Sequence, residues 1–283
     1  MKRFALTVVS LPLLIAVLAA SPALAEKPDR NAPVQVALGD SWAASVGASS
    51  PAQGYVRQLH QVLRNDLNCH GRAPAQASSG CKQLRLVDEA IGGATTPSMV
   101  AIQFPRAIPL LERRDETRKP NDDVEVITVH IGGNDVTNPI IAACLAGGLT
   151  PACVATIQTE FAAYRTDLDG ALATLRGAAG PDARIVIGTY DNPFRFPTCF
   201  IGQQFPQSAL LGELVLEGGL PGVVPIGLHD IMREVAADHE VRVAESHGDL
   251  GPLDWVGGLD CLHPVDSGYD KVTVSFAQAL GLN

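Results

Sequence analysis

Apolar residues along the chain follow two alternating patterns, short runs of strand type and longer stretches with one-sided helical spacing. Five short runs rich in Val, Ile and Leu are typical of strands: 34–38, 84–91, 124–131, 184–188 and 241–244. Apolar stripes at helical spacing predict helices between and after them, over 55–67, 99–111, 157–175, 226–239 and 267–280. Strands that alternate with helices predict a parallel sheet covered on both faces, and therefore one three-layer α/β domain.

One region fits neither pattern. Segment 191–222 is rich in Pro and Gly, which predicts a long loop with a helical insert near 209–216. Its phenylalanines are candidates for a cover over a crevice: Phe194, Phe196, Phe200 and Phe205.

The first residues differ from the rest of the chain. A basic start precedes an almost unbroken apolar run over 4–20, and Ala23-Leu24-Ala25 then forms a small-x-small cleavage signal. This pattern predicts a signal peptide over 1–25 and a secreted protein, extracellular or periplasmic, with one domain over 26–283. A membrane anchor is the alternative, but the run is shorter than the ~20 residues of a spanning helix and contains Pro12. We therefore expect no stable membrane anchor.

The chain contains six cysteines, and an even number in an exported protein indicates disulfides. Several connectivities are possible, of which sequential pairing is the least demanding. It would join Cys69–Cys81, Cys144–Cys153 and Cys199–Cys261. A metal site is the alternative, but no Cys-x-x-Cys or His-x-x-x-His spacing occurs, so we expect no bound metal.

Composition and charge narrow the possible partners. A content of 46% hydrophobic and 18% charged residues is too apolar for a disordered chain. A net charge of −9 without a basic cluster excludes nucleic acid as an expected partner. The oligomeric state stays open, with a monomer as the favoured state.

Residues that could take part in catalysis lie where the expected strands end. The first strand ends in Gly39-Asp40-Ser41, the second in Gly92-Gly93, and the third in Gly132-Gly133-Asn134-Asp135. Ligands of open parallel sheets bind beyond the carboxyl ends of the strands, so these three motifs should converge. Near the end of the chain, Asp260-Cys261-Leu262-His263-Pro264 is expected in a loop that folds back to the same edge.

These residue types suit nucleophilic catalysis. A serine, a histidine and a carboxylate in one crevice can act as nucleophile, general base and orienting group. Neighbouring glycines let backbone N–H groups approach a developing oxyanion, and Asn134 adds a side-chain donor. We expect Asp40 and Asp135 to shape their turns through hydrogen bonds from their side chains to the backbone.

In these motifs the chain resembles the SGNH (GDSL) hydrolase family, and within it the secreted, disulfide-bearing esterases and lipases. The matching blocks run from Leu38 to Ser41, Gly92 to Thr96, Ile131 to Asp135 and Asp260 to Pro264, in the family's order. The resemblance implies a flavodoxin-like sheet of about five strands in the order 2-1-3-4-5.

The resemblance also implies roles for particular residues. Ser41 would be the nucleophile, His263 the base and Asp260 the group that orients the imidazole. The Ser41 N–H, the Gly93 N–H and the Asn134 amide would form the oxyanion hole. Two alternatives stay open: Gly92 in place of Gly93, and a backbone carbonyl in place of Asp260.

The resulting hypothesis is a secreted serine esterase or lipase that hydrolyses small-molecule or lipid esters through an acyl-enzyme, without a cofactor. The Gly-x-Ser-x-Gly elbow of α/β-hydrolases is absent from the sequence. A carbohydrate-deacetylating esterase of the same family is the main alternative, because it would use the same residues. A non-catalytic secreted binding domain is the other, and the filled catalytic positions argue against it.

Overall fold

A computed structural model of the chain describes residues 33–67, 84–115, 124–145 and 147–282. The expected signal peptide and the expected Cys69–Cys81 bridge lie outside these residues. Within the described residues, no helix has both the length and the apolar character needed to cross a membrane.

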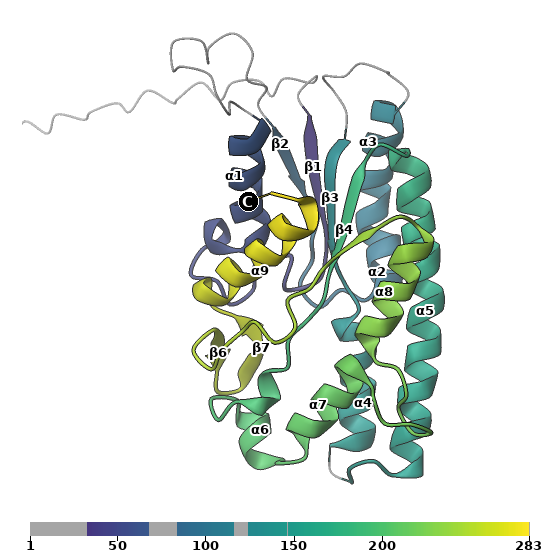
Figure 1. The fold of residues 1–283 in the computed structure, drawn as a ribbon, viewed down its shortest axis with the longest axis vertical. Helices are drawn as coiled ribbons and strands as arrows, with labels where there is room; N and C mark the ends of the chain where they lie inside the picture. The colour runs from purple at the N-terminus through teal and green to yellow at the C-terminus, as the bar shows by residue number, and fades with distance from the viewer. Residues whose placement is uncertain (1–32, 68–83, 116–123, 146, 283) are drawn as a thin grey trace, which may run out of the picture.

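Five parallel strands form the central sheet, in the order β2-β1-β3-β4-β5 (Figure 1). Their bounds are β1 Val34–Gly39, β2 Arg85–Asp88, β3 Val124–His130, β4 Arg184–Gly188 and β5 Arg242–Ala244. All six residues of β1 are buried, as are the last four of β4. Burial on both faces explains why these strands appear in the sequence as apolar runs. The structure confirms the predicted α/β fold and its strand order.

Helices cover both faces of this sheet (Figure 1). α1 (Tyr55–Leu67) and α9 (Asp266–Leu280) lie together on one face. α3 (Phe104–Asp115), α5 (Pro151–Ala179) and α8 (Leu228–Asp238) cover the other face. The expected helix over 99–111 is a longer stretch, in which α2 (Thr96–Ser98), the π-helical η3 (Met99–Gln103) and α3 follow one another directly. Two short 3₁₀ turns, η1 (Pro51–Gln53) and η4 (Pro193–Arg195), lie in the connections that follow β1 and β4.

Several shorter elements gather beyond the carboxyl ends of the strands, at the lower edge of the sheet in Figure 1. They are α4 (Gly133–Cys144), α6 (Phe200–Gln204), α7 (Ser208–Glu217) and the antiparallel pair β6 (Trp255–Gly257) and β7 (Asp260–Pro264). α7 matches the helical insert expected within the long loop.

The segment Asp260–Pro264 was expected to be a loop, and this prediction is wrong. It forms β7, which pairs with β6 through a tight connection at Gly257 and Gly258, both with positive φ. Glycine adopts such a backbone conformation without steric cost, which permits the tight reversal. Because β6 and β7 are short and partly exposed, their sequences contain no extended apolar pattern from which strands could be predicted.

The structure contains two of the expected disulfides. Cys144–Cys153 joins the end of α4 to the first turn of α5. Cys199–Cys261 joins the residue before α6 to β7. The pairing predicted for these four cysteines is confirmed.

Candidate active site

A pocket of about 370 Å³ opens at the carboxyl edge of the sheet. Its lining includes Ser41 after β1, Gly92 and Gly93 after β2, Asn134 in α4 and His263 in β7. The structure therefore brings the separate motifs to one place, as the strand-end rule predicts. Asp260 is not part of this lining and contacts the site through His263.

Ser41 stands on a turn whose start is tightly held. A Cβ on Gly39, which has a φ of +136°, would lie 2.2 Å from the carbonyl oxygen of His130. Only glycine lets β1 and β3 come this close at that point. The side-chain amide of Gln103 accepts a hydrogen bond from the Gly39 N–H at 2.8 Å and donates one to the Gly39 carbonyl at 2.7 Å. Beyond the end of β2, Gln103 thus makes the two backbone hydrogen bonds that a neighbouring strand would make.

Asp40 links this turn to the loop after β4. Its buried carboxylate accepts hydrogen bonds from the Trp42 N–H at 3.0 Å and from the Tyr190 hydroxyl at 2.6 Å. Burial raises the pKa of Asp40 to about 7, although both hydrogen bonds oppose the shift. The bond to Trp42 confirms that Asp40 shapes its turn.

Asn134 lies in the first turn of α4, where its amide nitrogen donates to the Ala94 carbonyl at 3.0 Å. That nitrogen carries a second hydrogen, and the nearest acceptor for it is the Asp40 carboxylate at 3.5 Å. This weak contact leaves the hydrogen able to turn to a ligand. Among the described residues, no group accepts a hydrogen bond from the N–H of Ser41 or of Gly93.

Asp135, the next residue of α4, holds the loop that carries the two glycines. Its carboxylate accepts from the Thr96 N–H at 2.9 and 3.0 Å, which confirms its expected role in shaping the backbone. Both Gly92 and Gly93 border the pocket, so the choice between their N–H groups stays open.

His263 is positioned by its neighbours on β7. Its Nδ1 lies 2.5 Å from Asp260 Oδ1, which leaves Nε2 as the nitrogen free to accept a proton. The indole N–H of Trp42 donates to the Leu262 carbonyl at 3.0 Å, so the residue after Ser41 holds the strand that carries His263. Ser41 and His263 share the pocket lining without a direct hydrogen bond between them, which is common in sites without substrate.

Tyr190 was missed by the sequence analysis. It follows β4 by two residues and donates its hydroxyl to Asp40, while its backbone N–H donates to His229 Nε2 at 3.0 Å. His229 is fully buried, with Nδ1 2.6 Å from Glu217. The rule that locates ligands at strand ends points to Tyr190 as well, but no motif singles it out.

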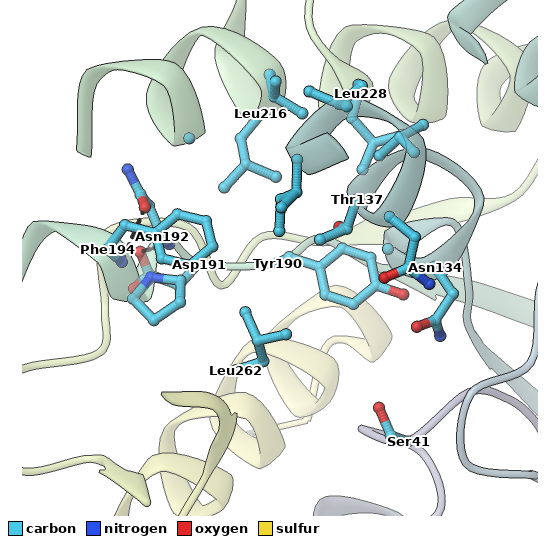
Figure 2. A pocket seen from close by; sticks show the side chains of 18 of the residues that line it. Ser41, Asn134, Thr137, Tyr190, Asp191, Asn192, Phe194, Leu216, Leu228 and Leu262 are labelled. Atoms are coloured by element: carbon cyan, nitrogen blue, oxygen red, sulfur yellow. Dashed lines mark hydrogen bonds between the residues drawn. The ribbon is translucent and has the colours of Figure 1, made fainter. Parts of the chain in front are cut away.

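Much of the pocket is apolar (Figure 2). α4 contributes Val136, Ile140 and Ile141, and α7 contributes Leu211, Val215 and Leu216. Of the four phenylalanines expected to cover the crevice, Phe194 alone is part of this lining. Phe196 packs against the hydrophobic core, and Phe200 is 43% exposed.

Comparisons with known proteins agree with the fold. The family model described as "GDSL-like Lipase/Acylhydrolase family" matches residues 37–271. The extracellular lipase of Streptomyces rimosus is 18% identical, with a TM-score of 0.53 over 88% of this chain and 99% of that one.

Two further solved structures have the same fold. Phospholipase A1 from Streptomyces albidoflavus NA297 is 21% identical, with a TM-score of 0.51 over 88% of this chain and 98% of its own. The acetylxylan esterase Axe2 from Geobacillus stearothermophilus is 13% identical, with a TM-score of 0.51 over 90% and 98%. Such identities establish a common fold and leave the substrate open. No match was found among curated protein sequences.

Proposed function

Because the chain belongs to the GDSL-like lipase/acylhydrolase family, we propose that it is a secreted serine hydrolase of carboxylic esters that works through an acyl-enzyme. The observation that carries the proposal is that Ser41, Asn134 and His263, from distant parts of the chain, line one pocket. The 2.5 Å contact between Asp260 and His263 supports it further, because it leaves the imidazole with a free Nε2.

In the proposed first step, His263 Nε2 takes the proton of the Ser41 hydroxyl as Oγ attacks the ester carbonyl carbon. The Ser41 N–H, the Gly93 N–H and the Asn134 amide donate to the resulting oxyanion. Asp260 stabilises the imidazolium. When the intermediate collapses, His263 gives its proton to the departing alcohol oxygen, and the acyl group stays on Ser41.

In the second step, His263 takes a proton from water, whose oxygen attacks the acyl carbonyl carbon of the intermediate. Collapse releases the carboxylic acid, and the proton returns to Ser41 Oγ. The residues named supply a nucleophile, a base and oxyanion donors, so the proposed reaction needs no cofactor.

Secretion is part of the proposal. Two disulfides within the described residues are typical of an oxidising compartment. The apolar leader with its small-x-small site favours the same conclusion.

The proposed function is tested by Ser41→Ala, with Ser50→Ala as the matched control. Ser50 lies in the same loop, and its side chain does not cap the 3₁₀ turn that follows it. We expect Ser41→Ala to lower the hydrolysis of p-nitrophenyl butyrate by ~10⁴- to 10⁶-fold, because nucleophile and base act as a unit. A folded Ser41→Ala protein that keeps a tenth of the wild-type rate would refute the assignment.

A phosphonate ester probe gives a second readout that is independent of turnover. Peptide mapping should find the phosphonyl group on Ser41 in the wild-type protein. Labelling of another serine, or no labelling of the folded protein, would contradict the proposal.

A further inference from the structure

The pocket at Ser41 extends well beyond the atoms that ester cleavage requires. Figure 2 shows Ser41 at one end of it and Leu216 and Leu228 at the other, with Tyr190 between them. The distant part is walled by apolar side chains of α4 and α7. A nucleophile, a base and oxyanion donors would function without this extension, so it calls for a separate explanation.

The pocket is much larger than a very small acyl group. An acetyl group places one methyl group beyond the carbonyl, whereas the pocket measures about 370 Å³. At about 30 Å³ for a water-sized group, it has room for roughly ten methylene-sized groups.

The far wall is held in place before any ligand binds. Asn192 donates to the Ala209 carbonyl at 2.9 Å and to the Glu213 carboxylate at 3.1 Å, which attaches α7 to the loop after β4. A Cβ on Gly212 would lie 2.6 Å from the Asn192 side-chain oxygen, so this attachment is close. A preformed apolar wall binds a flexible chain without first having to order itself.

The two faces of α7 differ in exposure, as expected for a helix that forms one wall of a pocket. Leu211, Val215 and Leu216 border the pocket, whereas Leu210 is 63% exposed and lies outside the lining. The helix therefore directs one face into the cavity.

We propose that α4 and α7 form the acyl-chain site of this protein and that its substrates are esters of medium-chain fatty acids, about eight to ten carbons long. The inference rests on the proposed function. Leu216 sets the length of chain that fits, because its side chain stands at the end of the pocket far from Ser41. The chain of the substrate runs from the carbonyl at Ser41 past Tyr190 toward this residue.

The first test is a series of p-nitrophenyl esters from acetyl to palmitoyl with the wild-type protein. Each methylene that moves from water to an apolar wall favours binding about fourfold. With half of the added methylenes buried, kcat/KM for the octanoyl ester should exceed that for the acetyl ester by at least about 50-fold. Equal or faster hydrolysis of the acetyl ester would overturn the inference.

The second test changes the far wall. Leu216→Trp should lower the ratio of kcat/KM for the decanoyl ester to kcat/KM for the acetyl ester at least about tenfold, because the added ring fills the distant part of the pocket. Leu210→Trp adds the same side chain to the exposed face of α7 and should leave the whole series unchanged.

Leu216→Ala tests the same wall with a smaller side chain, so the protein does not have to accommodate an added ring. It should shift the preferred ester toward longer chains, because it lengthens the cavity. Circular dichroism checks that each variant is folded. An unchanged chain-length profile in the folded Leu216 variants would overturn the assignment of this wall.

These outcomes separate the inference from the function on which it rests. Hydrolysis that depends on Ser41 but does not favour longer chains contradicts the acyl-chain site alone. If Ser41→Ala keeps the wild-type rate, or if no ester is cleaved, the proposed function fails and the inference fails with it.

Discussion

At the level of single residues, Asn134 has an unusual combination of contacts. One hydrogen of its amide is donated to the Ala94 carbonyl, and the nearest acceptor for the other is the Asp40 carboxyl group, whose pKa is raised by burial and which lies 3.5 Å from the amide nitrogen. A donor held in place but not fully satisfied is well suited to a charge that develops only during the reaction. Its contribution should therefore appear in the transition state and not in substrate binding.

Replacement of Asn134 by Ala should lower kcat by roughly 10²- to 10³-fold with little change in KM. Asn138→Ala is the matched control, since Asn138 lies one turn further along α4, borders the same pocket and is exposed. Steady-state kinetics on a single ester measures both constants. A variant that raises KM and keeps kcat would assign Asn134 to substrate binding instead.

At the scale of elements, the hairpin β6–β7 is the component that completes the site. Ser41 and Asn134 follow strands β1 and β3 of the five-stranded sheet, whereas His263 and Asp260 stand on a separate two-stranded sheet. The hairpin is attached to the rest of the protein near the site by the Cys199–Cys261 disulfide and by the hydrogen bond from the Trp42 indole. The position of the base therefore depends on a few local attachments.

Loss of the Cys199–Cys261 bridge should impair activity before it unfolds the sheet. The Cys199→Ser/Cys261→Ser variant should lose ~10²-fold in rate, because an error of about 1 Å in the position of the base costs that much. Esterase assays and circular dichroism along one temperature ramp should show the rate falling while the helices persist.

The Cys144→Ser/Cys153→Ser variant is the control for that experiment. Its bridge joins residues nine positions apart at the α4–α5 connection and does not touch the hairpin. A hairpin variant with the wild-type rate, or a free Cys261 thiol in active protein, would contradict the positioning role.

The sequence predicts best those elements that are buried, because burial on both faces requires a run of mostly apolar residues. β4 has the predicted bounds, and β1 extends the predicted run by one residue. α4 was not predicted, because its first turn has a Gly-Asn-Asp sequence typical of a turn and Pro139 lies inside it. The hairpin was missed because a disulfide and a tryptophan hold it, and neither leaves a periodic pattern.

The same distinction applies to the site. Ser41, Asn134 and His263 belong to local motifs at predictable strand ends, and the structure places them around one pocket. Tyr190 and the wall of α7 depend on how segment 191–222 folds back over the sheet. That path is set by tertiary contacts such as those of Asn192, which no local pattern encodes.

For the molecule as a whole, buried and half-buried titratable groups make the free energy of unfolding depend on pH in opposing directions. Burial raises the pKa of Asp40 to about 7 and lowers the pKa of His130 to about 3 and that of His60 to about 4. The folded protein thus binds a proton at Asp40 more tightly than the unfolded chain does, and binds protons at both histidines less tightly. The stability that Asp40 contributes is therefore complete below about pH 4 and is lost as the pH rises toward 7.

Asp40→Asn should remove the loss of stability that ionisation of the buried Asp40 causes as the pH rises. The free energy of unfolding of the variant should rise relative to that of the wild type between about pH 4 and pH 7, by at most about 1.4 kcal/mol per pH unit for one proton. Urea unfolding at a series of pH values measures both proteins. Parallel pH profiles would show that Asp40 does not titrate in this range.

The hydrogen bond between Trp42 and Leu262 joins residues 220 positions apart in the sequence. During synthesis from the N-terminus, the ribosome makes the serine early and the histidine near the end. A chain that lacks β7 would therefore carry the proposed nucleophile without its base, and we expect such a chain to have no esterase activity. Assembly of the proposed site waits until β7 packs against Trp42.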